Sequence, residues 1–280
     1  MPHTTLISCA DAQLELNHPN TRVIDCRFDL MNPEKGQVLY LQDHLPNAIY
    51  AHLDKDLSAP ITPTTGRHPL PSIESLIDTF SRWGIDNTTQ VIVYDDSIGM
   101  FASRLWWLLR WLGHDKVAVL DGGYQAWKDA GLPLEHTIPS LTPSPFLSHR
   151  QNDWIVESDA IENKQTQGFL LLDARAAERF RGEVEPIDAV AGHIPAAVNY
   201  PLTDNIENGL FRSSSELNKQ FAAVIQNYSA DKIIHYCGSG VSACHNILAM
   251  EHAGMHGSKL YPGSWSEWIR NPSRSIAKGE

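Results

Sequence analysis

The sequence contains few cysteines and no spacing that would pair them. Cys9, Cys26, Cys237 and Cys244 are the four, and no two of them form a C-x-x-C motif. Disulfide frameworks and zinc sites need recognisable cysteine spacings, so neither is expected. Four unpaired thiols fit a reducing compartment, and we therefore predict a cytoplasmic protein.

Long apolar runs and an excess of basic residues are also missing. The longest apolar segment, Leu105–Leu112, is interrupted by Arg110 and is far too short to cross a bilayer. Residues 1–12 lack the basic and apolar regions of a signal peptide, which also favours the cytoplasm. With 22 Lys and Arg against 33 Asp and Glu, the net charge of −11 argues against nucleic acid or anionic membranes as partners. Local positive groups would have to bind an anionic substrate.

What the sequence does contain is an internal duplication. Matching segments recur in the same order at an offset of about 140 to 150 residues. The pairs are Thr21–Arg27 with Phe169–Arg175 (both apolar and ending in Asp-x-Arg), His44–Ala48 with His193–Ala197, Val91–Tyr94 with Ile233–Tyr236, and Gly99, Gly113, Gly122 and Trp127 with Gly240, Gly254, Gly263 and Trp268.

Each copy alternates short apolar strands with segments of helical periodicity. This alternation is typical of an α/β fold with a mostly parallel sheet flanked by helices. Between the copies, Pro139, Pro143 and Pro145 cannot continue a helix or a central strand. We therefore predict two α/β domains, over residues 1–138 and 154–280, joined by a linker over residues 139–153.

A small-residue loop in the second copy carries the strongest chemical signal. Cys237 directly follows the apolar run Ile233–Tyr236, and Gly238-Ser239-Gly240-Val241-Ser242 leads on to a helical pattern over Cys244–Gly254. Glycines let such a loop curl, so that backbone N–H groups and the positive end of the helix dipole face the sulfur. These surroundings lower the pKa of a thiol from about 8.5. A buried structural cysteine is the alternative, and the loop favours a nucleophile.

The two copies differ where chemistry would occur. Asp95 stands in the first copy at the position of Cys237, so only the second copy has the nucleophile. Arg179 corresponds to Met31, and an arginine restricted to the active copy favours substrate binding over the alternative of a solvated surface arginine. The Asp-x-Arg motif occurs in both copies, which predicts a scaffold ion pair or hydrogen bond.

The first copy has a surplus loop at residues 58–71, rich in proline and glycine, that contains Arg67 and His68. Such loops often complete a site on a rigid α/β scaffold. A surface loop without a chemical role is also compatible with its composition.

Together these motifs resemble the tandem-domain sulfurtransferases of the rhodanese family. The resemblance covers nearly the whole chain. It is carried by Asp173-Ala174-Arg175-x-x-x-Arg179-Phe180, Gly192-His193-Ile194-Pro195-x-Ala197-x-Asn199, the Cys237 loop, and Asp121-Gly122-Gly123-x-x-x-Trp127. It implies an inactive N-terminal domain and an active C-terminal one. The cysteine of the active domain takes sulfane sulfur from a donor, holds it as a persulfide and passes it to a nucleophilic acceptor, without a metal or organic cofactor.

The loop is similar to that of the mercaptopyruvate branch of this family. The thiosulfate branch usually has basic residues after the cysteine, where this chain has neutral Gly238 and Ser239. The resemblance also implies a relay of Asp54, His68 and Ser239 that supplies a proton. It further implies that Arg179 orients the donor, in a site formed with the loop residues Gly238, Gly240, Val241 and Ser242.

One position departs from the mercaptopyruvate pattern. A second substrate arginine typically follows the Glu-Pro pair, whereas here Ile187 follows Glu185-Pro186. Either Arg181 or Arg67 could replace it.

Several alternatives stay open. The donor could be thiosulfate, with cyanide or a thiol as acceptor, or the chain could be a non-enzymatic sulfur relay for a protein partner. A redox role for Cys26 or Cys244 is also open. A cysteine phosphatase is disfavoured, because its C-x5-R loop needs an arginine where this chain has Ala243.

Overall fold

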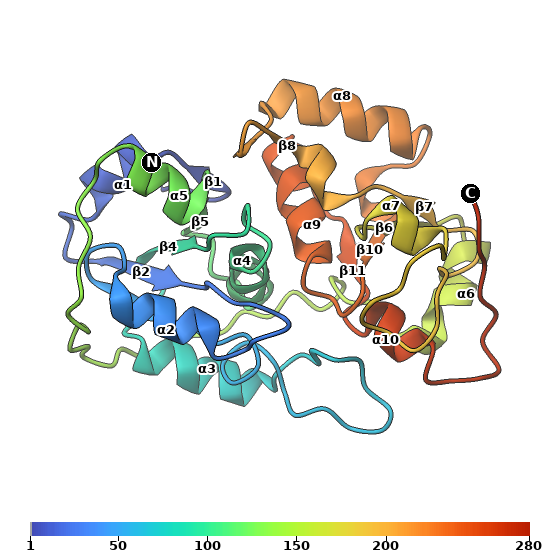
Figure 1. Cartoon of the computed structure of the whole chain (residues 1–280), viewed down its shortest axis with the longest axis horizontal. Helices are drawn as coiled ribbons and strands as arrows, with labels where there is room; N and C mark the ends of the chain where they lie inside the picture. Colours follow the sequence, from blue (N-terminus) through green and yellow to red (C-terminus); the bar gives the residue numbers. More distant parts are fainter. Residues whose placement is uncertain (1) are drawn as a thin grey trace. The chain divides into compact units, whose positions relative to one another are not determined.

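The computed structural model describes residues 2–280, which form two compact units (Figure 1). The N-terminal unit contains the chain up to Ala59 together with Leu70–Gln151. The C-terminal unit contains Asn152–Glu280 together with the segment Pro60–Pro69, which comes from the first half of the sequence. The surplus loop that carries Arg67 and His68 therefore belongs largely to the C-terminal unit.

Each unit is built on a parallel sheet. In the N-terminal unit the strand order is β1-β5-β4-β2-β3, and in the C-terminal unit it is β11-β10-β6-β7. The strands of the first sheet are β1 (Leu6–Ile7), β2 (Thr21–Asp25), β3 (Ala48–Tyr50), β4 (Gln90–Tyr94) and β5 (Val117–Leu120). Those of the second are β6 (Leu170–Asp173), β7 (Val198–Asn199), β10 (Ile233–Tyr236) and β11 (Lys259–Leu260).

The order β5-β4-β2-β3 repeats as β11-β10-β6-β7, so the duplication in the sequence is also present in the topology. At the position of β1, the second unit has an isolated parallel bridge between Ile155 and Leu260. The predicted α/β class, with two copies of one unit, is confirmed.

Short helices connect the strands in both units. In the N-terminal unit they are α1 (Cys9–Glu15), α2 (Lys35–Gln42), α3 (Ile73–Arg82), α4 (Ala102–Trp111) and α5 (Gly123–Asp129). In the C-terminal unit they are η1 (Ser158–Ala160), α6 (Ile161–Thr166), α7 (Ala177–Phe180), η2 (Leu202–Asn205), α8 (Ser214–Ile225), η3 (Ala230–Lys232), α9 (Ala243–His252) and α10 (Ser264–Trp268), with a hairpin of β8 (Ile206–Glu207) and β9 (Leu210–Phe211). Throughout residues 2–280, every helix is too short or too polar to span a bilayer.

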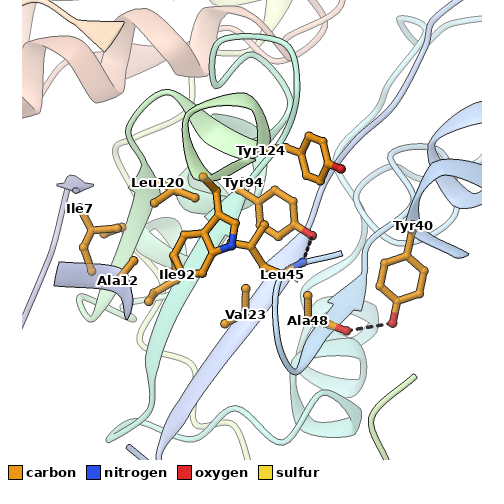
Figure 2. Close-up of a cluster of buried hydrophobic side chains, with 12 residues drawn as sticks. Ile7, Ala12, Val23, Tyr40, Leu45, Ala48, Ile92, Tyr94, Leu120 and Tyr124 are labelled. Atoms are coloured by element: carbon orange, nitrogen blue, oxygen red, sulfur yellow. Dashed lines mark hydrogen bonds between the residues drawn. The ribbon is translucent and has the colours of Figure 1, made fainter. Parts of the chain in front are cut away.

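The core of the N-terminal unit lies against its sheet and includes residues of β2, β4 and β5 (Figure 2). Polar groups inside it are satisfied internally: the Tyr40 hydroxyl donates to the Ala48 carbonyl at 2.8 Å, and the Tyr94 hydroxyl accepts from the Leu45 amide at 3.2 Å. In the second unit the Tyr236 hydroxyl accepts from the Ile194 amide in the same way, at 3.3 Å. Both copies therefore use a strand tyrosine to hold the His-x-Pro turn.

The shared Asp-x-Arg motifs form buried ion pairs, as predicted. Arg27 pairs with Asp25 and Arg175 pairs with Asp173, each at 2.7 Å, and all four side chains are at most 2% exposed. A buried pair of this kind is costly to break because it leaves an uncompensated charge. The motif fixes the carboxyl end of β2 or β6 in each copy.

Residues 139–151, assigned from their prolines to a linker, run along the N-terminal unit. The Ser144 amide donates to the Ser81 carbonyl at 3.0 Å, and the His149 amide donates to the Leu112 carbonyl at 2.8 Å. The exact domain limits stay predictions.

Candidate active site

Cys237 stands at the carboxyl end of β10, where the chain turns into α9. The Gly240 amide donates to Cys237 Sγ at 3.2 Å, so a loop N–H group points at the sulfur as the sequence predicts. The carbonyls of Cys237 and Gly238 accept from the amides of Trp265 and Ser266 in α10, at 3.0 and 2.9 Å. With 1% exposure, Cys237 sits in a pocket of the backbone that is largely shielded from water.

The curl of this loop depends on Gly240. Its φ of +79° lies in the left-handed region, and a Cβ there would stand 2.2 Å from the Pro262 carbonyl oxygen. Both conditions exclude a larger residue without movement of the loop. The glycine thus places its own amide against the sulfur.

Ser264 also positions the nucleophile, and the sequence pattern gave no indication of it. Its Oγ accepts from the Cys237 amide at 3.1 Å and donates to the Tyr261 carbonyl at 2.9 Å. Its φ of +53° is unusual for a residue with a side chain, and the corresponding residue of the first copy, Gly123, has a φ of +57°. The serine keeps the backbone shape and adds a hydroxyl that holds the cysteine.

The equivalent loop of the first copy is filled by a carboxylate. Asp95 accepts hydrogen bonds of 2.8 to 2.9 Å from the amides of Ser97, Gly99, Phe101 and Ala102. Burial raises the pKa of Asp95, and the four N–H groups oppose this shift by stabilising the anion. The first copy has thus kept an amide-lined loop and occupies it with its own side chain.

His68 and Ser239 meet in the C-terminal unit. His68 Nδ1 lies 2.7 Å from Ser239 Oγ, and both residues are 6% exposed. Asp54, the third member of the expected relay, belongs to the N-terminal unit, where its amide donates to His52 Nδ1 at 3.1 Å. The relay role of Asp54 stays a prediction.

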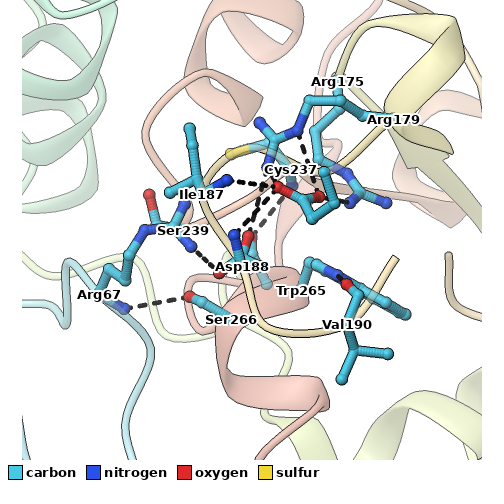
Figure 3. A network of polar contacts seen from close by, with 12 residues as sticks. Arg67, Arg175, Arg179, Ile187, Asp188, Val190, Cys237, Ser239, Trp265 and Ser266 are labelled. Carbon is cyan, nitrogen blue, oxygen red and sulfur yellow. Dashed lines mark hydrogen bonds and ion pairs between the residues drawn. The ribbon is translucent and has the colours of Figure 1, made fainter. Parts of the chain in front are cut away.

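Two guanidinium groups flank the loop at Gly238 (Figure 3). A Cβ added at Gly238 would lie 2.8 Å from Arg67 Nη2, and 3.7 and 3.8 Å from Arg179 Nη2 and Nη1. The Arg67 backbone is fixed by its amide, which donates to Ser266 Oγ at 3.1 Å. Arg181 instead pairs with Glu183 at 2.8 Å, with about a third of the arginine side chain and half of the glutamate exposed. Of the two arginines left open by the sequence, Arg67 is the one beside the cysteine loop.

The counterions of these arginines were not anticipated from the sequence. Glu185 Oε1 accepts from Arg179 Nη2 at 2.7 Å, and Asp188 pairs with both Arg67 and Arg179. Burial disfavours the charged form of Glu185, yet hydrogen bonds from Arg179 and from the Asp188 amide hold its pKa below the ordinary value. Burial raises the pKa of Asp188, against the attraction of Arg67. The sequence feature that could have indicated these counterions is the presence of acidic residues after Arg179.

The remaining loop residues and cysteines have structural contacts. The Val241 carbonyl accepts from the Cys244 amide at 3.0 Å, and the Cys244 thiol donates to the Gly240 carbonyl at 3.4 Å. Ser242 directly precedes α9. Cys26 lies buried in the N-terminal unit, where burial raises the pKa of its thiol well above the ordinary value. Contacts of Val241 and Ser242 with a donor stay predictions, as does a redox role for Cys26 or Cys244.

The site has a recognisable set of parts: a cysteine with a loop amide on its sulfur, two arginines beside it, and a histidine–serine pair. Comparisons with known proteins place the whole chain rather than its individual site residues. A protein from Pseudomonas aeruginosa named "Probable 3-mercaptopyruvate sulfurtransferase" is 44% identical, with 100% of each chain covered. The thiosulfate sulfurtransferase of Rattus norvegicus is 32% identical over 94% of this chain and 90% of its own length.

A solved structure is similar over the same extent. The 3-mercaptopyruvate sulfurtransferase from Leishmania major superimposes with a TM-score of 0.84 at 33% identity, covering 97% of this chain and 76% of that one. The family model for the rhodanese-like domain matches twice, at residues 8–130 and 157–271. The chain therefore belongs to the rhodanese family and contains two rhodanese-like domains.

Proposed function

We propose that this chain is a sulfurtransferase that moves sulfane sulfur from a small anionic donor, 3-mercaptopyruvate, through a persulfide on Cys237 to a thiophilic acceptor. The observation that carries the proposal is the convergence on one loop of the Cys237 sulfur, the Gly240 amide and the guanidinium groups of Arg67 and Arg179. Relatives named for this activity cover the chain and support the same reaction.

Donor binding is assigned to the two arginines. A guanidinium offers paired N–H donors that match a carboxylate, and a charge-assisted contact is stronger than a neutral one. Both guanidinium groups approach the position that a Cβ of Gly238, the residue after the nucleophile, would occupy. Holding the donor carboxylate there would bring the donor sulfur toward Cys237 and convert an encounter into a near-attack geometry.

In the first half-reaction the Cys237 thiolate attacks the donor sulfur. A new S–S bond forms as the donor C–S bond breaks, and the electron pair of that bond stays on carbon to give the enolate of pyruvate. The Gly240 amide, 3.2 Å from Sγ, would stabilise both the thiolate and the persulfide anion. The amide matters because neutral Gly238 and Ser239 follow the cysteine, where a cation would otherwise serve.

The enolate must gain a proton to become pyruvate. The Ser239 hydroxyl is hydrogen-bonded to His68 Nδ1 at 2.7 Å, and the pair can deliver a proton from the imidazole through the hydroxyl. Asp54 is proposed to orient His68, as the family pattern implies. In the second half-reaction a thiol or cyanide attacks the outer sulfur of the persulfide and regenerates the Cys237 thiolate.

Two alternatives have some support. Thiosulfate is the donor of a relative that covers 94% of this chain, and the same loop could take sulfur from it with sulfite as the leaving group. A protein acceptor in place of a small thiol would make the chain a sulfur relay. A cytoplasmic location, proposed from the unpaired thiols, is compatible with any of these.

Sulfur loading of Cys237 tests the proposal directly. After treatment with 3-mercaptopyruvate, mass spectrometry should show a gain of about 32 Da on the peptide that contains Cys237. The Cys237→Ser variant should be folded and unlabelled, and Cys244→Ala should still be labelled. Labelling confined to another cysteine would disprove the assignment of Cys237 as the nucleophile. The preferred donor is identified by a separate measurement, in which kcat/KM is compared for mercaptopyruvate and thiosulfate with cyanide as acceptor. A persulfide that forms but turns over with neither cyanide nor thiols would favour the relay.

A further inference from the structure

Asp188 stands between the two guanidinium groups that flank the cysteine loop. Its Oδ1 accepts from Arg67 Nη1, and its Oδ2 lies 3.3 Å from Arg179 Nη2 (Figure 3). The Asp188 side chain is 4% exposed, whereas the Arg67 and Arg179 side chains are 23% and 17% exposed. A donor arriving from solvent can therefore reach the arginines, while the carboxylate behind them already neutralises part of their charge.

The charges around the loop balance. Three arginines are joined by ion pairs to three carboxylates. They are Arg67, Arg175 and Arg179, with Asp173, Glu185 and Asp188. A monoanionic donor adds one negative charge to this neutral cluster, and a dianion adds two. In both cases the added charge lies beside a cysteine that must be ionised to react.

The three carboxylates have different partners. Asp173 belongs to the scaffold pair with Arg175, and Glu185 accepts from Arg175 at 3.4 Å and from Arg179 at 2.7 Å. Asp188 joins Arg67 to Arg179 and thereby links the loop segment Pro60–Pro69 to the segment after α7. Of these three carboxylates it is the one that pairs with both Arg67 and Arg179.

We propose that Asp188 is a specificity-determining residue that positions Arg67 and Arg179 and favours monoanionic donors over dianionic ones. The inference rests on the proposed function, because it concerns the donor site. Coulomb energy is proportional to the charge of the ligand, so a fixed carboxylate in the cluster penalises a dianion about twice as strongly as a monoanion. Such discrimination by a built-in repulsive charge is a common way to obtain specificity.

Binding of unreactive anions tests the inference without any turnover. The probes are pyruvate, a monoanion, and sulfate, a dianion, titrated into the resting enzyme and followed by calorimetry or ligand-observed NMR. Asp188→Asn removes the charge and keeps the shape. We expect the ratio of the sulfate Kd to the pyruvate Kd to fall by roughly tenfold or more. Asp188→Ser removes the same charge and serves the same purpose if the asparagine variant does not fold.

Two matched controls isolate the effect of this charge. Asp188→Glu keeps the carboxylate and should keep the wild-type ratio. Glu183→Gln removes a carboxylate from the exposed pair with Arg181 in the same segment and should also leave the ratio unchanged. In steady-state assays, Asp188→Asn should raise kcat/KM for thiosulfate relative to mercaptopyruvate, with the change mainly in KM.

Several outcomes would overturn the inference. An unchanged ratio of anion affinities in a folded Asp188→Asn protein is one, and an equal weakening of both anions, which indicates a purely structural contact, is another. If instead the wild type transfers sulfur from neither donor but the affinity ratio shifts as expected, the proposed function fails and the role of Asp188 in anion selection stands.

Discussion

His68 Nδ1 lies 2.7 Å from Ser239 Oγ, although the two residues are 171 positions apart in the chain. The contact exists because Pro60–Pro69 packs with the C-terminal unit rather than with the part of the sequence that surrounds it. Both side chains are buried. A hydrogen bond shielded from water holds the Ser239 hydroxyl in one orientation, two residues after the nucleophile.

Loss of the His68–Ser239 hydrogen bond should slow sulfur transfer from 3-mercaptopyruvate more than sulfur transfer from thiosulfate. His68→Ala should lower kcat with 3-mercaptopyruvate by about a hundredfold, because the leaving enolate needs a proton and general acid catalysis is worth at least that much. Sulfite leaving from thiosulfate needs no such proton, so the loss with thiosulfate should be smaller. Steady-state kinetics with both donors and cyanide as acceptor measure the difference.

The matched variant for this prediction is Ser239→Ala. It should show the same donor dependence, and the double variant should lose little more than the worse single variant, since the two residues act as one unit. Equal losses with both donors would indicate that the pair only supports the loop.

The effect of replacing an arginine on the KM for the donor should depend on whether that arginine lies beside the cysteine loop. Arg67→Ala and Arg179→Ala should each raise the KM for mercaptopyruvate by about 10- to 100-fold, as expected for the loss of a charge-assisted contact worth about 1.5–3 kcal/mol. Arg181→Ala should leave KM within about twofold, since exposed ion pairs contribute little. A larger effect at Arg181 than at Arg67 would mean that the donor binds elsewhere in the C-terminal unit.

The sequence was sufficient for the parts of the site that depend on local geometry. A strand that ends at Tyr236, two glycines and a following helix predict the curled loop, and the structure has β10 ending at Tyr236 and α9 beginning at Ala243. The Asp-x-Arg pairs could be predicted for a similar reason, since their partners are two residues apart in each copy.

The rest of the site depends on contacts between distant segments. The residues that neighbour Arg67 and Arg181 in the sequence do not indicate which of the two arginines lies beside the cysteine loop. That difference arises from where the segment Pro60–Pro69 packs. Glu185 and Asp188 flank a proline and an exposed isoleucine, which resembles a surface turn, and their burial follows only from the arginines that they contact. The charged contacts around the site therefore depend on packing between segments that are distant in the sequence. The position of the nucleophile depends on the local sequence pattern instead.

The carboxylate in the first copy should be a stabilising element. Asp95→Asn replaces one acceptor oxygen by an NH₂ group that faces backbone N–H donors, so at least two of the four amide hydrogen bonds are lost. The cost should be about 2–6 kcal/mol, at about 1–3 kcal/mol for each of the two unsatisfied buried donors. Denaturant unfolding at neutral pH measures it.

Asp96→Asn, at the exposed neighbouring position, is the control for this measurement and should change stability by less than about 0.5 kcal/mol. A loss no larger in Asp95→Asn than in the control would mean that water satisfies the loop amides, and that the aspartate is not needed to fill the loop.

The last prediction concerns His235, a fully buried residue of β10. Burial lowers its pKa to about 3, from an ordinary value of 6.5. Its Nε2 lies 3.2 Å from Met250 Sδ, and its Nδ1 has no hydrogen-bond partner within the part of the chain that the structure describes. Between pH 6.5 and about 3 the imidazole therefore stays neutral in the folded protein, whereas an unfolded chain would protonate it.

Proton linkage fixes the sign of the effect. Between pH 6.5 and about 3 the unfolded state binds a proton at His235 that the folded state does not. The contribution of His235 to stability is therefore lost as the pH falls, by up to about 1.4 kcal/mol per pH unit. His235→Leu removes the imidazole that binds the proton, together with its unpaired nitrogen. The free energy of unfolding of this variant should therefore fall less between pH 7 and pH 5 than that of the wild type. Unfolding free energies at pH 7 and pH 5 measure the change.

His256→Gln, at a side chain that is 69% exposed, is the matched control and should follow the wild type. If His235→Leu loses as much stability between these pH values as the wild type does, then the folded protein accepts the proton, and the burial of this histidine does not limit its stability in acid.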